Sequence, residues 1–102
     1  MINPYEGHYE FNDGIVRGWD SDAIGVYYCG YKNASGGLIP LYIGKGTSDK
    51  GIKGRLLDHL RDDNWPDVTH FGYQFCSTVF EAEALESEKI QYHKPGYNKQ
   101  GK

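Results

Sequence analysis

Two short runs of β-branched and aromatic residues, joined by turn-forming residues, constrain the fold of this chain more than any other feature. The first run is IGVYYCGY at 24–31, and the second is LIPLYIG at 38–44. Such runs are typical of β-strands, and the intervening KNASGG is typical of a turn. The sequence therefore predicts an antiparallel hairpin. Pro40 is expected at a strand start or a sheet edge, because proline cannot donate a backbone hydrogen bond.

A helix and a third strand are predicted after the hairpin. Four apolar residues share one helical face and predict a helix over 52–62; they are Ile52, Leu56, Leu57 and Leu60. Aromatic residues then alternate at positions 71, 73 and 75. This period of two predicts a strand over 69–77.

A second helix is predicted near the C-terminus. Thr78-Val79-Phe80-Glu81 fits a capping box, in which the first and fourth side chains satisfy backbone groups at a helix start. We expect this helix over about 79–93, ended by Lys94-Pro95-Gly96. The predicted order is β-β-α-β-α. It indicates an α+β fold with helices packed on a small, mostly antiparallel sheet.

The first 23 residues show no clear period. Residues 1–24 carry five acids and one base, and Asn12-Asp13-Gly14 is a turn signal. We therefore expect an irregular acidic arm over 1–23, with a short strand near 14–17. The main domain is expected over 24–102.

Length and composition indicate one small domain with no membrane span. The chain has 102 residues and a net charge of −3. It shows neither a signal-peptide pattern nor an apolar stretch of about 18 residues. Its two cysteines form no CxxC pair and are expected as reduced thiols, with a disulfide left open. We therefore expect a cytoplasmic protein without a membrane partner.

Basic residues concentrate in two places despite the negative net charge. Residues 45–61 contain five bases and two acids, and four lysines without an acid follow Glu88. Local basic patches of this kind can hold phosphates. The alternative is an ordinary solvated surface.

Three side chains are candidates for chemistry. Glu86 shares a helical stripe with apolar neighbours, where an ionised carboxylate is costly unless it is paired, hydrogen-bonded or metal-bound. Arg55 and His59 lie four residues apart, hence on one helical face, and arginine suits bidentate phosphate binding. The alternatives are a carboxylate that reaches solvent and a simple surface pair.

Other site classes find no support in the sequence. Gly44-Lys45-Gly46-Thr47 lacks the lysine followed directly by Ser or Thr that a P-loop needs. The four histidines and two cysteines show no zinc-ligand spacing. Neither cysteine has surroundings that mark an activated thiol.

The candidate residues occur in a specific order along the chain. Gly25-Val26-Tyr27 and Tyr42-Ile43-Gly44 come first, followed by Arg55, then Glu86, then Pro95-Gly96-Tyr97-Asn98. This order resembles the GIY-YIG nuclease family over residues 24–99. The resemblance implies a three-stranded antiparallel sheet flanked by helices. It also implies hydrolysis of a DNA phosphodiester with one divalent cation per active site, Mg²⁺ or Mn²⁺.

The resemblance also implies roles for individual residues. Glu86 would bind the cation and Arg55 the scissile phosphate, while Asn98 would hold the site together through side-chain hydrogen bonds. Gly44 would let the backbone approach the phosphate. Lys45 and Lys53 would add positive charge for the DNA.

The residue that accepts the proton of the attacking water is left open. Tyr42 is the best candidate, supported by a hydrogen bond from Tyr27. Its ordinary pKa of about 10 would have to be lowered by the cation and nearby positive groups. His59 is expected in the same site as a base or a phosphate contact.

Two further functions are carried as alternatives. One is a catalytically inactive nucleic-acid-binding module on the same fold, and the other is an interaction protein that uses the acidic arm. Because no added DNA-binding domain is recognised, we expect weak binding, a homodimer or a larger assembly that supplies target specificity.

Overall fold

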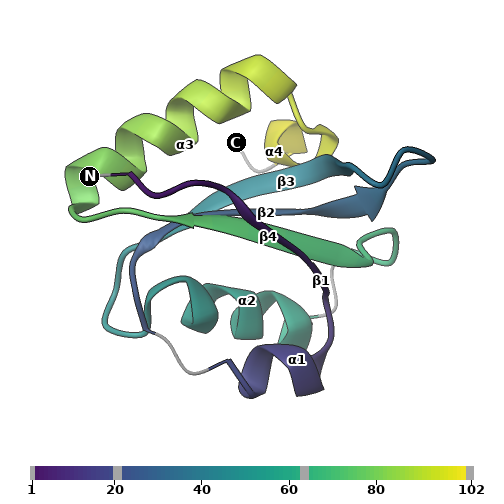
Figure 1. Ribbon diagram of the computed structural model, residues 1–102, viewed down its shortest axis with the longest axis horizontal. Helices are drawn as coiled ribbons and strands as arrows, with labels where there is room; N and C mark the ends of the chain where they lie inside the picture. The colour runs from purple at the N-terminus through teal and green to yellow at the C-terminus, as the bar shows by residue number, and fades with distance from the viewer. Residues whose placement is uncertain (1, 20–21, 63–64, 101–102) are drawn as a thin grey trace.

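The computed structural model describes residues 2–19, 22–62 and 65–100 and has an α+β fold (Figure 1). Its elements are β1 (Glu6–Glu10), α1 (Asp13–Arg17), β2 (Gly25–Lys32), β3 (Leu38–Gly46), α2 (Gly51–Asp62), β4 (His70–Phe75), α3 (Val79–His93) and α4 (Gly96–Gln100). The strands form one antiparallel sheet in the order β1-β4-β2-β3. Helices α1 and α2 cover one face, and α3 and α4 lie on the other side (Figure 1).

The predicted hairpin is confirmed, with β2 inside the sheet and β3 at its edge. Strand β2 pairs with β3 from Gly25 opposite Gly46 to Lys32 opposite Leu38, and with β4 on its other side. Pro40 lies in edge strand β3 beside an irregularity of the β2–β3 register, which a residue without an N–H tolerates. The sheet therefore places the first aromatic run in its interior and the second on its open edge.

The expectation of an irregular arm with a strand near 14–17 is wrong. Residues 6–10 form β1, which pairs with β4, and residues 13–17 form α1. The side chain of Asn12 caps α1 by accepting the backbone N–H of Ile15 at 2.8 Å. The sheet therefore has four strands rather than three. No period-two signal is visible for β1, because nearly all of its residues are exposed.

The two predicted long helices are confirmed. Thr78 caps α3 by accepting the N–H of Glu81 at 3.1 Å, and Lys94 ends it in the left-handed region at φ 49°. The short helix α4 follows and was not predicted. Five residues are too few to show a helical period, and Pro95-Gly96 is typical of a segment that ends a helix.

Alternation along β2 sends successive side chains to opposite faces of the sheet. Tyr27 and Cys29 pack with the α2 residues Ile52 and Leu56. Tyr28 packs with α3 residues on the other face. Both cysteines are buried free thiols. Among the described residues, no helix is long and apolar enough to cross a membrane.

Candidate active site

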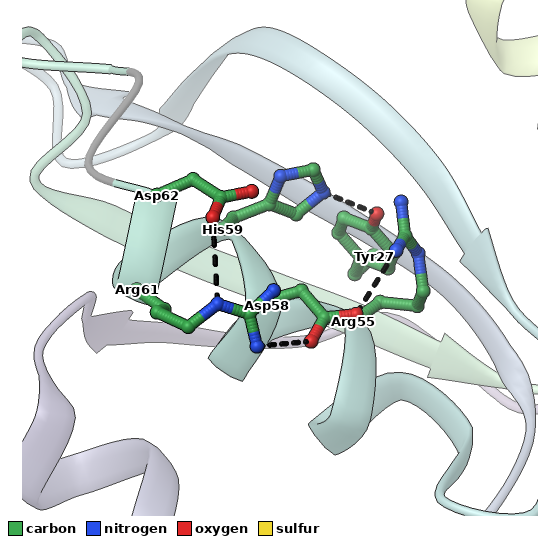
Figure 2. Close-up of polar contacts among 6 residues, drawn as sticks. All are labelled: Tyr27, Arg55, Asp58, His59, Arg61 and Asp62. Carbon is green, nitrogen blue, oxygen red and sulfur yellow. Dashed lines mark hydrogen bonds and ion pairs between the residues drawn. The ribbon is translucent and has the colours of Figure 1, made fainter.

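Tyr27 and His59 form the centre of the candidate site. The Tyr27 ring is fully buried, and its hydroxyl lies 2.9 Å from Nε2 of His59 on α2 (Figure 2). Arg55 lies one turn before His59 and points to the same side of α2 (Figure 2). The strand interior and one helix face thus bring three of the predicted residues together.

Gly44 makes room for the tyrosines. A Cβ at this position would lie 2.5 Å from the Tyr27 hydroxyl oxygen and 2.8 Å from Cε2 of Tyr42. Real Cβ atoms essentially never come this close to another heavy atom. The space beside Gly44 is therefore filled by the two rings, which is a reason for glycine that sequence analysis did not anticipate.

Tyr42 lies at the solvent-facing side of the same cluster. Its ring centroid is 6.1 Å from that of Tyr27 and 5.3 Å from that of His59, which it meets edge-on. Tyr42 is half-buried, whereas Tyr27 is fully buried. Tyr42 is therefore the more solvent-accessible of the two tyrosines.

Arg55 carries the positive charge of the cluster. Its Nη1 donates to Oδ2 of Asp58 at 3.1 Å, and its side chain is 43% exposed. Burial raises the pKa of Tyr27, and the charge of Arg55 acts against this by favouring the phenolate form. Asp58 also pairs with Arg61 at 3.3 Å, which divides its negative charge between two guanidinium groups (Figure 2). Arg55 is thus left accessible to an anion.

The aromatic groups are neutral in the chain alone. Burial raises the pKa of Tyr27 and Tyr42 despite the opposing charge of Arg55. Burial, followed by the charge of Arg55, lowers the pKa of His59 to about 4. The expected lowering of the Tyr42 pKa is therefore absent without a bound cation. The Tyr27 hydroxyl can donate its hydrogen to Nε2 of the neutral imidazole when that nitrogen carries no proton.

Glu86 lies at the edge of the apolar stripe of α3. Ala82 and Leu85 are buried, whereas the Glu86 side chain is 22% exposed. Its Oε1 lies 3.7 Å from Nζ of Lys45, which also lies 4.0 Å from Glu83. Burial is the largest cause of the raised pKa of Tyr42, and the Glu86 charge adds to it, so the carboxylate acts electrostatically on this phenol.

Asn98 fastens the C-terminal segment to β3. Its Oδ1 accepts the N–H of Ile43 at 2.8 Å, and its Nδ2 donates to the carbonyl of Ile43 at 2.9 Å. Ile43 lies on an edge strand, where the outward backbone groups have no neighbouring strand to bond. A single side chain therefore fixes the residue between Tyr42 and Gly44.

Lys53 is not brought into this cluster. Its Nζ donates to the carbonyl of Arg17 on α1 at 3.1 Å, and it lines a separate hollow beside Trp19. Two residues along a helix correspond to a rotation of about 200°. Lys53 therefore faces away from the side of α2 that carries Arg55.

Two aromatic members of the site, Trp65 and Tyr97, were not predicted as site residues, although Tyr97 lies in the motif at 95–98. The Trp65 ring centroid is 4.1 Å from that of His59 and 4.8 Å from that of Tyr42. Tyr97 stacks on Trp65 at an interplanar angle of 12°. Trp65 lies in the connection between α2 and β4, where no period exists to indicate what it contacts.

The donor set of the site fits a cation that keeps most of its own water. Among the described residues, no group of three or more His, Cys, Asp or Glu side chains could enclose a metal ion. Mg²⁺ is commonly held by one or two carboxylates together with waters and substrate phosphates. Glu86 meets this requirement, because its carboxylate is partly exposed beside the cluster.

Comparison of the chain with family models, curated proteins and solved structures finds no match in any of the three. A functional proposal for this chain therefore depends on its own residues and their geometry.

Proposed function

We propose that this chain is a divalent-metal-dependent DNA endonuclease of the GIY-YIG type. The observation that carries the proposal is the grouping of Tyr27, His59 and Arg55 on one side of α2, with a Glu86 carboxylate that acts electrostatically on the adjoining Tyr42. A phosphate, a water and a cation all have candidate partners in this arrangement. The resemblance of the sequence motifs supports the same reaction.

Arg55 would bind the scissile phosphate. Guanidinium groups suit phosphate oxygens geometrically, and their charge stabilises the negative charge that develops during hydrolysis. The Arg55 side chain is partly exposed, and its Nη1 pairs with Asp58. The other guanidinium nitrogens would bind the incoming phosphate. Lys45 would add a second positive charge at the edge of β3.

The hydroxyl groups and His59 would carry the proton of the attacking water. Tyr42 is the more exposed phenol, and its ring centroid lies 6.1 Å from that of Tyr27, whose hydroxyl partner is His59. Tyr42 would accept the water proton and pass its own proton through Tyr27 to Nε2. Because the pKa of His59 is lowered to about 4, the imidazole is unprotonated at neutral pH and would take up this proton transiently.

Glu86 would hold the divalent cation, Mg²⁺ or Mn²⁺. When bound, the cation supplies positive charge to the phosphate and to the departing 3′ oxygen. Glu86 would exchange its contact with Lys45 for this cation, which frees the lysine for the DNA backbone. A homodimer or a larger assembly would supply the target specificity, and we propose a cytoplasmic location.

Nicking of supercoiled plasmid by purified protein tests this proposal. We expect nicking with Mg²⁺, none with a chelator, and none by the Glu86→Gln variant. The control is Glu88→Gln, which removes an exposed carboxylate of the same helix and should leave nicking unchanged. Nicking that persists in Glu86→Gln would contradict the assigned role of Glu86. DNA binding without any cutting would instead support the inactive binding module.

A further inference from the structure

Trp65 covers one face of the His59 imidazole. The two ring centroids are 4.1 Å apart and the rings are inclined by 33°. The other aromatic neighbours in the described part of the chain, Tyr42 and Tyr27, are farther away at 5.3 and 5.8 Å. The indole is therefore the nearest aromatic contact of the imidazole, and it belongs to none of the sequence motifs.

Trp65 is itself held in place by several contacts. Its ring stacks with that of Tyr97, whose hydroxyl donates to Oδ2 of Asp67 at 3.0 Å. Phe11 packs on it with centroids 6.2 Å apart. The Trp65 carbonyl also accepts the N–H of Val68 at 3.2 Å. The aromatic contacts come from residues that precede and follow Trp65 in the chain, and they restrict movement of the indole.

We propose that Trp65 is a positioning residue of this site, and that its indole keeps the His59 ring oriented with Nε2 on the Tyr27 hydroxyl. The catalytic meaning of this role rests on the proposed function. The contact itself exists in the free protein. The indole also excludes water from one face of the imidazole, and loss of water disfavours a charged ring.

The charged groups around His59 leave water exclusion as the main influence on its protonation. On α2, Arg55 disfavours the imidazolium, whereas Asp58 and Asp62 favour it. The sheet contributes only the neutral phenols of Tyr27 and Tyr42. Burial is the largest cause of the lowered pKa. Opening the face that Trp65 covers should therefore raise the pKa of His59.

NMR titration of the histidine rings in the free protein tests the proposal without DNA or metal. In Trp65→Ala we expect the His59 pKa to rise from about 4 towards the ordinary value of about 6.5, with loss of the single Nε2-accepting tautomer. Trp65→Phe should give a smaller rise, because a phenyl ring covers part of the same face. Phe80→Ala is the matched control, since Phe80 is 78% exposed and lies at the start of α3.

An unchanged His59 pKa and tautomer in a folded Trp65→Ala variant would overturn the proposal. If that variant does not fold, Trp65→Phe decides: a rise above the Phe80→Ala value supports the role, and equality with it overturns the role. In an active nuclease, the acidic limb of the pH–rate profile should move to higher pH by the same amount as the His59 pKa. If the histidine titrations turn out as expected but the protein cuts no DNA, the positioning role of Trp65 stands and only the proposed nuclease activity is refuted.

Discussion

His59 links the stability of the molecule to pH. Its pKa is about 4 in the folded protein and about 6.5 in an unfolded chain. Between these values the unfolded state binds more protons than the folded state. The free energy of unfolding therefore falls as pH is lowered from 6.5 to 4.

The variant His59→Asn isolates this contribution. It lacks the titrating group, so its free energy of unfolding should decline less than that of the wild type over the same pH window. Urea denaturation at pH 7, 5.5 and 4 measures the difference. Parallel declines of the two proteins would show that His59 is not held neutral in the folded state.

Gly44 permits a second prediction at the scale of one residue. A methyl group in Gly44→Ala would meet the rings of Tyr27 and Tyr42, so at least one ring must move. Overpacking of this kind typically costs about 1–3 kcal/mol. Denaturation should show this loss, and the NMR signal of the Tyr27–His59 hydrogen bond should change. A variant as stable as the wild type, with that signal intact, would contradict the tight packing.

Helix α4 is tied to the sheet by one side chain. Asn98→Ala removes both hydrogen bonds to Ile43 and leaves two backbone groups of β3 without these partners. We expect a loss of about 1–3 kcal/mol in the free energy of unfolding. Urea denaturation measures it, with the exposed α3 substitution Gln91→Ala as the control. Equal stability of the two variants would show that the clamp contributes nothing.

The elements that were predicted are those with an apolar pattern in their own sequence. Helices α2 and α3 bury apolar residues at spacings of four and three, and β2 buries six consecutive residues of an apolar and aromatic run. Strand β1 has no such pattern. It is stabilised by pairing with β4 and by aromatic contacts such as Tyr9 on Phe71, which only the folded sheet creates.

The same distinction applies to the site. Arg55 and His59 were placed on one face by helical spacing alone. Trp65 reaches His59 through the fold of a connection, and Lys53 turns away from the cluster to meet α1. Contacts of this kind depend on tertiary packing, for which the local sequence holds no signal.

At the scale of the whole molecule, the N-terminal residues are part of the folded structure. Val16 is fully buried, and Trp19 packs on Tyr73 with centroids 4.6 Å apart. Strand β1 covers the edge of β4. The first residues therefore contribute to the core as well as to the surface.

Deletion of residues 2–11 should consequently destabilise the protein. It removes β1 and exposes the edge of β4, which favours association with another chain. We expect a lower melting temperature and a larger apparent size at high concentration, measured by thermal denaturation and size-exclusion chromatography. An unchanged melting temperature would show that β1 is dispensable for the fold.

Cleavage by two arginine variants of α2 tests the central claim most directly. Arg55 faces Tyr27, whereas Arg61 is 71% exposed and pairs with Asp58 and Asp62 (Figure 2). We predict that Arg55→Ala nicks supercoiled plasmid in Mg²⁺ about 10²–10³-fold more slowly than wild type, the range found when one stabilising donor is lost. Arg61→Ala should remain near the wild-type rate. Equal rates for the two variants, or a wild-type protein that never nicks DNA, would contradict the account.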